Sequence, residues 1–284
     1  MEPGDIWPRG SRSSTRRGRI MDPGKFKGLI KEGRVYDLGM EYFVGMPHHP
    51  NHPPFAFALT KLHGEVVYPG GVSACNCLFT TGGHTGTHID ALGHISLNGR
   101  VFGVGEIGPF QDYYGLKKGG IETVSPIVAR GILLDIAGLE GKECLDEGFE
   151  IDARVLSEAE KEQGVVIGEG DCALIRTGWI RHFGDPRAYV SHERGCPGLV
   201  EDGARWLASK KVSCVGSDTL ALEKTPTAHL PVHVILLVEN GIHIMEVLNL
   251  EELARDKVWE FLLIVSPLKI RGGTASPVRP VAIA

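Results

Sequence analysis

The sequence predicts an α/β fold in which a mixed sheet or barrel-like core is covered by helices. Apolar runs with the length of strands recur through the second half of the chain and are bounded by glycine. Stretches with helical character lie between these runs, and this alternation favours α/β over a bundle or a sandwich. The 38 glycines among 284 residues are spread along the whole chain, so they indicate many tight turns rather than one linker.

The predicted elements follow in chain order. We expect strands in the apolar runs at residues 132–136, 172–177, 212–215, 234–238, 242–247 and 261–265. We expect helices at residues 153–163, 198–210 and 250–257. The first helix has Asp152 at the position of an N-terminal cap, and Gly164 follows its last residue as a C-terminal stop.

Residues 1–20 differ from the rest of the chain because they are rich in Arg and Ser and nearly lack aliphatic side chains. Glu2 and Asp5 argue against a transit peptide, which is poor in acidic residues. We expect a disordered extension over residues 1–20 and a single folded domain over residues 21–284, a length that can share one core.

The segment 40–57 contains four prolines together with His48, His49 and His52. Proline at this density excludes a regular helix or a central strand. Long loops in compact domains often bind ligands, so His48, His49 and the aromatic Phe55 are candidate substrate contacts. The alternative is a proline-stiffened surface loop with solvated histidines.

Composition restricts the class of partner. The chain carries 30 Lys+Arg against 35 Asp+Glu, a net charge of −5, and 42% of its residues are hydrophobic. No run approaches the about 18 apolar residues that span a bilayer, and no basic stripe interleaved with aromatic residues indicates nucleic acid. The six cysteines are scattered through apolar segments without a secretory leader, which predicts reduced thiols and a cytoplasmic protein. We expect a small-molecule partner.

The densest group of possible metal ligands is the run T-G-G-H-T-G-T-H-I-D-A-L-G-H, which extends from Thr81 to His94. It places His84, His88, Asp90 and His94 within eleven residues, separated mainly by small side chains. Imidazole nitrogen and carboxylate oxygen suit divalent ions such as Zn²⁺ or Mn²⁺, and three protein ligands leave a position for water or substrate. The alternative is a set of core or surface histidines in a glycine-rich turn.

A shared ion requires the chain to bend within this run. On an extended strand the first histidine and the aspartate lie about 20 Å apart, and on a regular helix the aspartate lies about 120° from the histidine face. Gly82, Gly83 and Gly86 supply the conformational freedom for a bend. The four-residue step from Asp90 to His94 fits a first helical turn that returns the imidazole to the same site.

A second set of possible ligands lies near the C-terminus, at His229, His233, His243 and Glu246. Glu246 stands inside an apolar run, so its carboxylate is directed to the interior, where it must be paired, protonated or bound to a metal. On a strand His243 faces away from Glu246, which makes it a solvated or packing residue. His233 precedes an aliphatic run and is the better candidate to converge with Glu246.

The run H-T-G-T-H-I-D-A-L-G-H resembles the H-x-G-T-H-x-D-x-P-x-H signature of the cyclase family of metal-dependent hydrolases, which includes bacterial kynurenine formamidase and isatin hydrolase. The resemblance extends from about residue 35 to the end of the chain, with further landmarks of the family at residues 170–179, 215–219, 233–246 and 272–280.

Two positions depart from the formamidase pattern. Leu92 stands where the formamidase signature has proline. His233 lies thirteen residues before Glu246, one more than the formamidases imply, which suggests an insertion near Glu239. These departures weaken the interpretation of the chain as a kynurenine formamidase in particular. They leave the prediction of a metal-dependent hydrolase unchanged.

The resemblance implies a swivelling β/β/α fold, a homodimer or homotetramer, and a place in tryptophan catabolism. It implies one or two divalent ions per chain, Zn²⁺ or Mn²⁺. His84, His88 and Asp90 would hold the first ion. In family members with two ions, Asp90, His233 and Glu246 would hold the second.

His94 would serve as the general acid and base in hydrolysis of an amide C–N bond, either a formamide or a cyclic amide, in a small aromatic substrate. This function is arylformamidase-like. The alternatives are a cyclic-imide or lactam hydrolase of the isatin hydrolase type, a metal-dependent lyase or cyclase, and a metal-containing binding protein without turnover.

Overall fold

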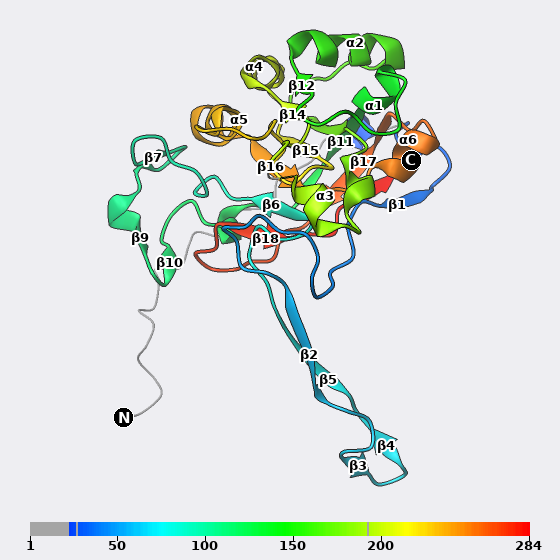
Figure 1. Ribbon diagram of the computed structural model, residues 1–284, viewed down its shortest axis with the longest axis vertical. Helices are drawn as coiled ribbons and strands as arrows, with labels where there is room; N and C mark the ends of the chain where they lie inside the picture. The colour runs from blue at the N-terminus through cyan, green and yellow to red at the C-terminus, as the bar shows by residue number, and fades with distance from the viewer. Residues whose placement is uncertain (1–22, 27, 192) are drawn as a thin grey trace.

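The computed structural model describes residues 23–26, 28–191 and 193–284. The predicted extension at residues 1–20 lies outside this part of the chain. The predicted α/β class is confirmed, because helices pack along a mixed sheet (Figure 1). Within the described residues, every helix is too short or too polar to cross a membrane.

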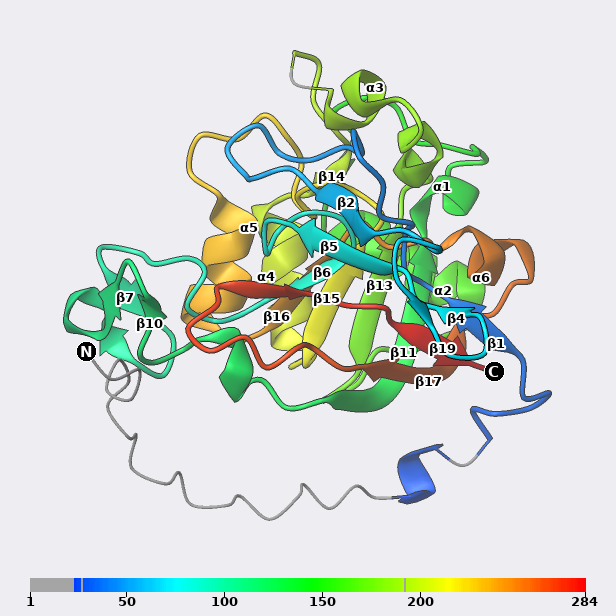
Figure 2. The same cartoon turned by 90° about the horizontal axis from the view of Figure 1, so that it is seen from below.

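Nine strands of the described chain form the main sheet. They are β1 Val35–Asp37, β6 His88–Asp90, β11 Ile127–Asp135, β13 Cys172–Arg176, β15 Cys214–Ser217, β16 His243–Glu246, β17 Glu260–Val265, β18 Ala275–Pro277 and β19 Val281–Ile283. Their order is β1-β19-β17-β11-β13-β15-β16-β6-β18. The four central strands β11, β13, β15 and β16 are parallel (Figure 2), and the strands on both sides join them antiparallel.

The helices are short except for two. The α-helices are α1 Ile136–Leu139, α2 Ala153–Gln163, α3 Pro186–Val190, α4 Glu201–Ser209, α5 Pro231–His233 and α6 Glu251–Arg255. α5 continues directly into a π-helix, η5 Val234–Glu239, and 3-10 turns occur at η1 Pro23–Phe26, η2 Gly108–Phe110, η3 Ile121–Thr123 and η4 Trp179–His182. Helix α2 has the predicted bounds, with the Asp152 carboxylate accepting from the N–H of Val155 and Gly164 in the left-handed conformation at φ 66°.

The remaining strands pair outside the main sheet. They are β2 Ala56–Lys61, β3 Val67–Tyr68, β4 Val72–Ser73, β5 Asn76–Thr80, β7 Arg100–Val101, β8 Gly105–Glu106, β9 Gln111–Asp112, β10 Gly115–Leu116, β12 Glu150–Ile151 and β14 Gly198–Leu199. Residues 40–55 contain neither helix nor strand, as the proline pattern predicts.

One predicted strand is wrong. Residues 234–238 are helical, because Pro231 starts α5 at its first turn and the apolar run continues that helix. A short, uniformly apolar run has the same pattern in a buried helix as in a buried strand. The helix predicted at residues 198–210 begins only at Glu201, because the two residues of β14 pair with β12.

The core lies on both faces of the main sheet. Along β11, Ile132 and Leu134 pack with the helices, whereas Leu133 packs on the opposite face with Ile89 of β6 and Phe261 of β17. This alternation is the expected consequence of the strand period of two. Strand β6 is therefore held firmly between buried neighbours.

Candidate metal centre

Strand β6 carries the central part of the predicted site. His88 and Asp90 project to one side of it, because side chains alternate along a strand, and Ile89 points into the core. β6 pairs antiparallel with β16, where Glu246 lies opposite His88, and with β18 on its other edge. Directly paired residues share a face. Accordingly, His88 Nε2 lies 3.3 Å from Glu246 Oε2.

The turn before β6 supplies His84, and it contains the predicted bend. Gly86 has a φ of +68°, a left-handed conformation that favours glycine. At Gly82 a β-carbon would lie 2.9 Å from a carbonyl oxygen of the facing loop, so a larger residue would displace that loop. Gly83 has no such constraint, because its nearest neighbour would be at 3.4 Å. The bend places His84 Nδ1 2.8 Å from Asp90 Oδ1.

The helical turn predicted after Asp90 is wrong. Residues 91–94 form a turn closed by a hydrogen bond of 3.0 Å from the His94 N–H to the carbonyl three residues before it. No helix follows, because the N–H of Gly93 bonds to a neighbouring loop. The turn nevertheless returns His94 to the site, where its ring centroid lies 3.8 Å from that of His84.

The structure brings His233 and Glu246 together, with 3.4 Å between His233 Nε2 and Glu246 Oε1. His233 is the last residue of α5, and the π-helix η5 follows at once. The backbone hydrogen bonds of a π-helix join residues five apart rather than four, so each turn holds additional chain. This helix therefore accommodates one additional residue near Glu239, where the spacing suggests an insertion.

The other two histidines of this set do not join the centre. The Nδ1–H of His243 donates to the backbone carbonyl of Asp90 at 2.8 Å, so His243 packs behind β6. His229 is exposed. Neither offers a free ligand atom to the side of β6 that carries His88.

We name six of these side chains the histidine–carboxylate cluster: His84, His88, Asp90, His94, His233 and Glu246. Within it, the possible ligand atoms of His84, His88 and Asp90 lie within 4.8 Å of one another, and so do those of Asp90, His94 and His233. Asp90 belongs to both groups. The geometry therefore allows one ion or two neighbouring ions that share this carboxylate.

The unpaired atoms of this cluster show that a cation fits. Five buried atoms have no hydrogen-bond partner: His84 Nδ1, His88 Nε2, both oxygens of Asp90, and Glu246 Oε1. His84 Nδ1 and His88 Nε2 lie 2.8 Å and 3.5 Å from Asp90 Oδ1, and Glu246 Oε1 lies 3.4 Å from His233 Nε2, without the alignment of a hydrogen bond. In a tetrahedral site, ligand bonds of about 2.0–2.2 Å to a zinc-like ion separate adjacent ligand atoms by about 3.3–3.6 Å, which is close to this spacing.

Hydrogen bonds on the far side of the imidazoles orient these atoms. The Nδ1–H of His88 donates to the carbonyl of Gly86 at 2.8 Å, which leaves Nε2 to face the carboxylates. His84 Nε2 bonds to the hydroxyl of Thr274 at 2.9 Å, which leaves Nδ1 to face Asp90. Such outer contacts are typical of histidine ligands, because they fix the tautomer.

Burial and charge act in opposite directions on the titrating groups. Burial alone would raise the pKa of Asp90, but the imidazoles of His94, His84 and His88 hold it well below its ordinary range. Burial lowers the pKa of His94 to about 4, so this imidazole is neutral at pH 7. Burial also disfavours a charged His233, but Glu223 and Glu246 raise its pKa to about 10.

The predicted substrate contacts lie at the loop that leads into β2. Phe55 is buried, and its ring meets Tyr42 edge-on at 5.6 Å. His48 bonds within the loop to the carbonyl of His49 at 3.0 Å. The residue of this loop that reaches the cluster is instead His52, whose ring centroid lies 5.1 Å from that of His84.

Sequence reasoning missed Glu223 as well as His52. Glu223 is buried, and its carboxylate accepts a short hydrogen bond from His233 Nδ1 and a weaker one from the N–H of Val232 at 3.4 Å. A carboxylate between Leu222 and a lysine gives only a weak signal of burial. The apolar residues on both sides of Glu246 give a stronger one.

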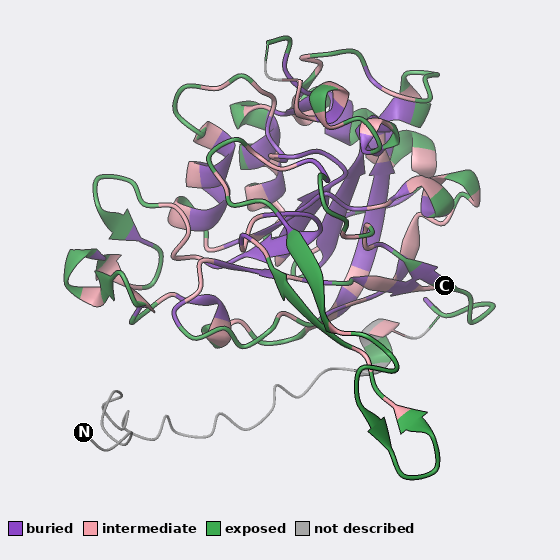
Figure 3. Cartoon of the chain, turned by 60° about the horizontal axis from the view of Figure 1, so that its bottom comes forward, coloured by how far each residue is buried: buried purple, intermediate pink, exposed green. Residues whose placement is uncertain are grey.

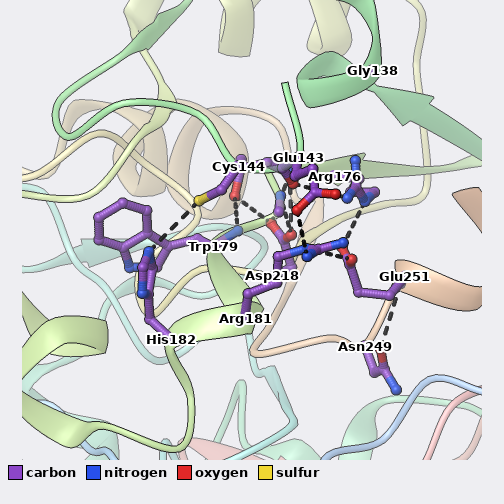
Figure 4. Close-up of polar contacts among 12 residues, drawn as sticks. Gly138, Glu143, Cys144, Arg176, Trp179, Arg181, His182, Asp218, Asn249 and Glu251 are labelled. Atoms are coloured by element: carbon purple, nitrogen blue, oxygen red, sulfur yellow. Dashed lines mark hydrogen bonds and ion pairs between the residues drawn. The ribbon is translucent and has the colours of Figure 1, made fainter. Parts of the chain in front are cut away.

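A second group of charged side chains gathers around Arg176 and Asp218, which are both buried (Figure 4). We name it the arginine network; its members are Asp135, Glu143, Arg176, Asp218 and Glu251. Arg176 donates to Glu251 Oε1 at 2.6 Å, to Asp135 Oδ1 at 2.7 Å and to the backbone carbonyl of Glu143 at 3.0 Å. Asp218 accepts from the hydroxyl of Thr177 at 2.6 Å and from its N–H at 2.9 Å.

Comparison with known proteins places these features in a family context. The family model described as "Putative cyclase" matches residues 36–224. An isatin hydrolase of Roseibium aggregatum is 28% identical over 209 residues, 71% of this chain and 72% of that protein. Cyclase-like protein 3 of Oryza sativa subsp. japonica is 28% identical over 211 residues, 70% of this chain and 62% of that protein.

Solved structures show the same fold. A crystal structure of a novel cyclase matches with a TM-score of 0.85 at 26% identity, over 93% of this chain and 92% of that one. Isatin hydrolase A from Ralstonia solanacearum matches with a TM-score of 0.67 at 25% identity, over 88% of this chain and 91% of that one.

Proposed function

Because the chain belongs to the cyclase family, we propose that it is a metal-dependent hydrolase that cleaves an amide C–N bond in a small aromatic substrate. The observation that carries this proposal is the set of five buried nitrogen and oxygen atoms that face one another without hydrogen bonds. Buried polar atoms normally find partners, so their concentration at one place indicates an ion that supplies the missing bonds.

The residues that would hold a divalent ion are His84, His88 and Asp90. His233 and Glu246 would complete a second position beside Asp90. When bound, Zn²⁺ or Mn²⁺ supplies Lewis-acid polarisation of a carbonyl and lowers the pKa of water to about 7.

His94 is placed to move the proton that amide hydrolysis requires. Its ring stacks on that of His84 at 3.8 Å and lies 6.2 Å from that of His233, between centroids, so it lies between a member of the first ligand group and His233. In the reaction, a C–O bond forms from water and the C–N bond breaks. His94 accepts the proton that water releases and delivers it to the nitrogen, because an unprotonated amide nitrogen is a very poor leaving group.

The aromatic character of the substrate is supported by the loop at the cluster. The His52 ring lies 5.1 Å from that of His84, and the same loop carries Phe55, whose ring packs edge-on against Tyr42. Flat apolar surfaces of this kind bind aromatic rings and exclude water. His48 and His49 lie one step farther out, with His49 at 5.2 Å from the ring of His52.

Among amides, a cyclic amide is favoured. The relative from Roseibium aggregatum is an isatin hydrolase, and so is the matching structure from Ralstonia solanacearum. A linear formamide is the second candidate, and it rests on the H-x-G-T-H-x-D signature. Leu92 and the longer step from His233 to Glu246 separate this chain from that pattern.

Metal stripping and reconstitution of the full chain test the proposal. The protein is dialysed against a chelator, reloaded with Zn²⁺ or Mn²⁺, and assayed with isatin and with N-formylkynurenine. We expect activity to disappear on stripping and return on reloading, with isatin the better substrate. Elemental analysis then gives the number of ions per chain, and two would implicate His233 and Glu246.

Three outcomes would contradict the proposal. Stripped protein as active as the loaded form would exclude metal-dependent hydrolysis. Tight binding of both amides without turnover by the loaded form would indicate a binding protein. Product free of labelled oxygen after reaction in ¹⁸O water would indicate a lyase or cyclase.

A further inference from the structure

The histidine–carboxylate cluster is closed off from solvent. His88 and Asp90 are each 1% exposed, and His233 and Glu246 are each 5% exposed. Figure 3 shows the main sheet, whose strands β6 and β16 carry three of these residues, buried among the surrounding segments. An ion that loads this centre must therefore cross a layer of protein and exchange the water of its hydration shell for protein ligands on the way.

Two side chains outside the cluster contact its imidazoles and carry possible ligand atoms of their own. Glu223 is 1% exposed, and both of its oxygens accept hydrogen bonds, from His233 Nδ1 and from the N–H of Val232. His52 is partly exposed, and its ring centroid lies 5.1 Å from that of His84. Of these two side chains, only His52 connects the cluster to solvent.

The loop that carries His52 is fastened to the bend that carries His84. The N–H of His52 donates to the carbonyl of His49 at 2.9 Å, which closes a turn. One residue farther along, the carbonyl of Pro53 accepts from the Thr85 hydroxyl at 2.9 Å. These bonds hold the His52 ring beside that of His84.

Hydrogen bonding fixes which nitrogen of His52 is free to bind a metal. Its Nδ1 lies 3.4 Å from the carbonyl oxygen of His84, and because a carbonyl only accepts, Nδ1 carries the proton of the neutral ring. Nε2 then holds the lone pair through which imidazole binds a metal. His49 has the opposite arrangement, because its Nδ1 accepts from the N–H of Asn51 at 3.2 Å and its Nε2 carries the proton. Of these two rings, only that of His52 offers Nε2 as a ligand.

The separation of His52 and His84 suits an ion that both rings contact. A ring nitrogen lies about 1.1 Å from its centroid and about 2.05 Å from a bound zinc ion, so two imidazoles on one tetrahedral ion have centroids about 5.1 Å apart. The measured separation is 5.1 Å. His52 belongs to neither group of converging ligand atoms, so it would share an ion with His84 only in transit.

We propose that His52 is the capture ligand of the metal centre. Its Nε2 binds an incoming Zn²⁺ or Mn²⁺ and then yields the ion to Nδ1 of His84, which presents its own lone pair when Nε2–H donates to the hydroxyl of Thr274. Each step replaces one bond from the ion to water or nitrogen by another, and no proton or electron moves. The carboxylates of Asp90 and Glu246 attract the cation inward. This role rests on the proposed metal-dependent function, because it concerns the loading of the same centre.

Metal-loading kinetics of the full chain test this role. Protein dialysed against a chelator is mixed rapidly with Zn²⁺ at about pH 7.5, where an ordinary imidazole is mostly neutral, and a zinc indicator dye reports uptake. Excess chelator then measures release. A residue on the path lowers the barrier equally in both directions. We therefore expect His52→Phe to slow uptake and release by the same factor, about tenfold, and to leave the dissociation constant unchanged.

A rescue variant and two controls accompany this measurement. His52→Cys supplies a sulfur ligand in place of imidazole, and we expect it to restore most of the lost rate. His63→Phe is the matched control, because it makes the same substitution at an exposed histidine between β2 and β3, and it should load at the wild-type rate. Asn51→Ala changes the exposed neighbour of His52 and should also load at the wild-type rate. Circular dichroism reports whether each variant is folded.

Three results would overturn the capture role. Unchanged rates and affinity in His52→Phe would mean that ions enter past His94, on the side of the proposed substrate, and would leave the proposed function intact. A raised dissociation constant with faster release would make His52 a resident ligand of the centre. A wild-type apoprotein that takes up no Zn²⁺ would contradict the proposed function itself, and the capture role with it.

Discussion

The two buried polar groups of this fold differ in how their atoms are satisfied. In the arginine network, Arg176 uses all three nitrogen atoms in hydrogen bonds, and Asp218 accepts from Thr177 and Gly178. In the histidine–carboxylate cluster five atoms have no such partner, and they are the only buried side-chain atoms without one among the described residues. A buried polar atom without a partner costs about 1–3 kcal/mol.

The difference separates a structural role from a ligand-binding one. The arginine network joins β13 to α1 and α6 and completes its own bonds. The histidine–carboxylate cluster is also held in place, because β16 and β18 pair with β6 on both sides. Five of its nitrogen and oxygen atoms nevertheless have no hydrogen-bond partner. Burial of charge alone does not point to a ligand, whereas burial without pairing supports the proposed metal site.

Asp90→Ala should give the largest effect, because Asp90 belongs to both ligand groups. We expect the variant to lose bound metal and to lose at least about 10⁴-fold in kcat/KM, equivalent to about 5 kcal/mol. Elemental analysis and the isatin assay measure the two losses. Asp146→Ala, which removes an exposed carboxylate, serves as the control. Full metal content in the Asp90 variant would mean that the histidine–carboxylate cluster, like the arginine network, has a structural role.

Arg176→Ala should act on stability instead. Loss of the guanidinium leaves Asp135 without a charged partner and Glu251 with Arg181 alone, and we expect unfolding to become easier by about 3 kcal/mol, the lower end of the range for a buried pair. Denaturant unfolding measures the loss, and metal per folded chain should be unchanged. The exposed Arg154 pairs with Glu158 on the surface of α2, so Arg154→Ala should change little. A folded Arg176 variant without metal would contradict the assignment.

The sequence predicts the histidine–carboxylate cluster better than it predicts the arginine network, because most members of the cluster are close in the chain. His84, His88, Asp90 and His94 fall in one short run, and the need for a bend follows from strand and helix geometry. Arg176 and its partner Glu251 are 75 residues apart in the sequence, and arginine and glutamate are residue types that usually lie on the surface. Only the strand order brings them together.

The fold shows the same dependence on local signals. The bounds of α2 follow from its caps, and the central parallel strands follow from apolar runs. The π-helix at residues 234–239 and the pairing of β2 with β5 outside the main sheet were not predicted. A uniformly apolar run has no period to distinguish helix from strand, and an exposed strand with apolar side chains has the pattern of a core strand.

The pH dependence of stability sharpens the comparison within the arginine network. Burial raises the pKa of Asp218 to about 6, although the bonds from Thr177 and Gly178 lower it. The folded state therefore holds this proton more tightly than the unfolded state. The protonated Asp218 carboxyl therefore contributes fully to the free energy of unfolding below about pH 4. As the pH rises through about 6 this contribution is lost, and the free energy of unfolding decreases by about 3 kcal/mol.

Asp218→Asn isolates that contribution. The difference in unfolding free energy between wild type and variant, measured by denaturant titration from pH 3.5 to about 7.5, should fall with pH and then become constant. A difference that does not change with pH would mean that the hydrogen bonds fully offset the burial of the carboxylate.

Glu223→Gln should give the smallest effect and tests the border between the two groups. Glu223 is fully bonded, like the arginine network, but its partner His233 belongs to the cluster. The substitution keeps the shape and removes the charge that holds Nδ1–H, so His233 becomes a weaker ligand. We expect metal affinity at the position of His233 and Glu246 to fall about 10- to 100-fold, measured by competition with a chelator.

Metal binding at His84 and His88 should be unchanged in this variant. The control is Glu239→Gln, which changes the exposed last residue of η5 and should leave metal affinity at both positions unchanged. If the chelator titration of the Glu223 variant matches wild type, Glu223 belongs with the structural carboxylates, and the cluster ends at His233.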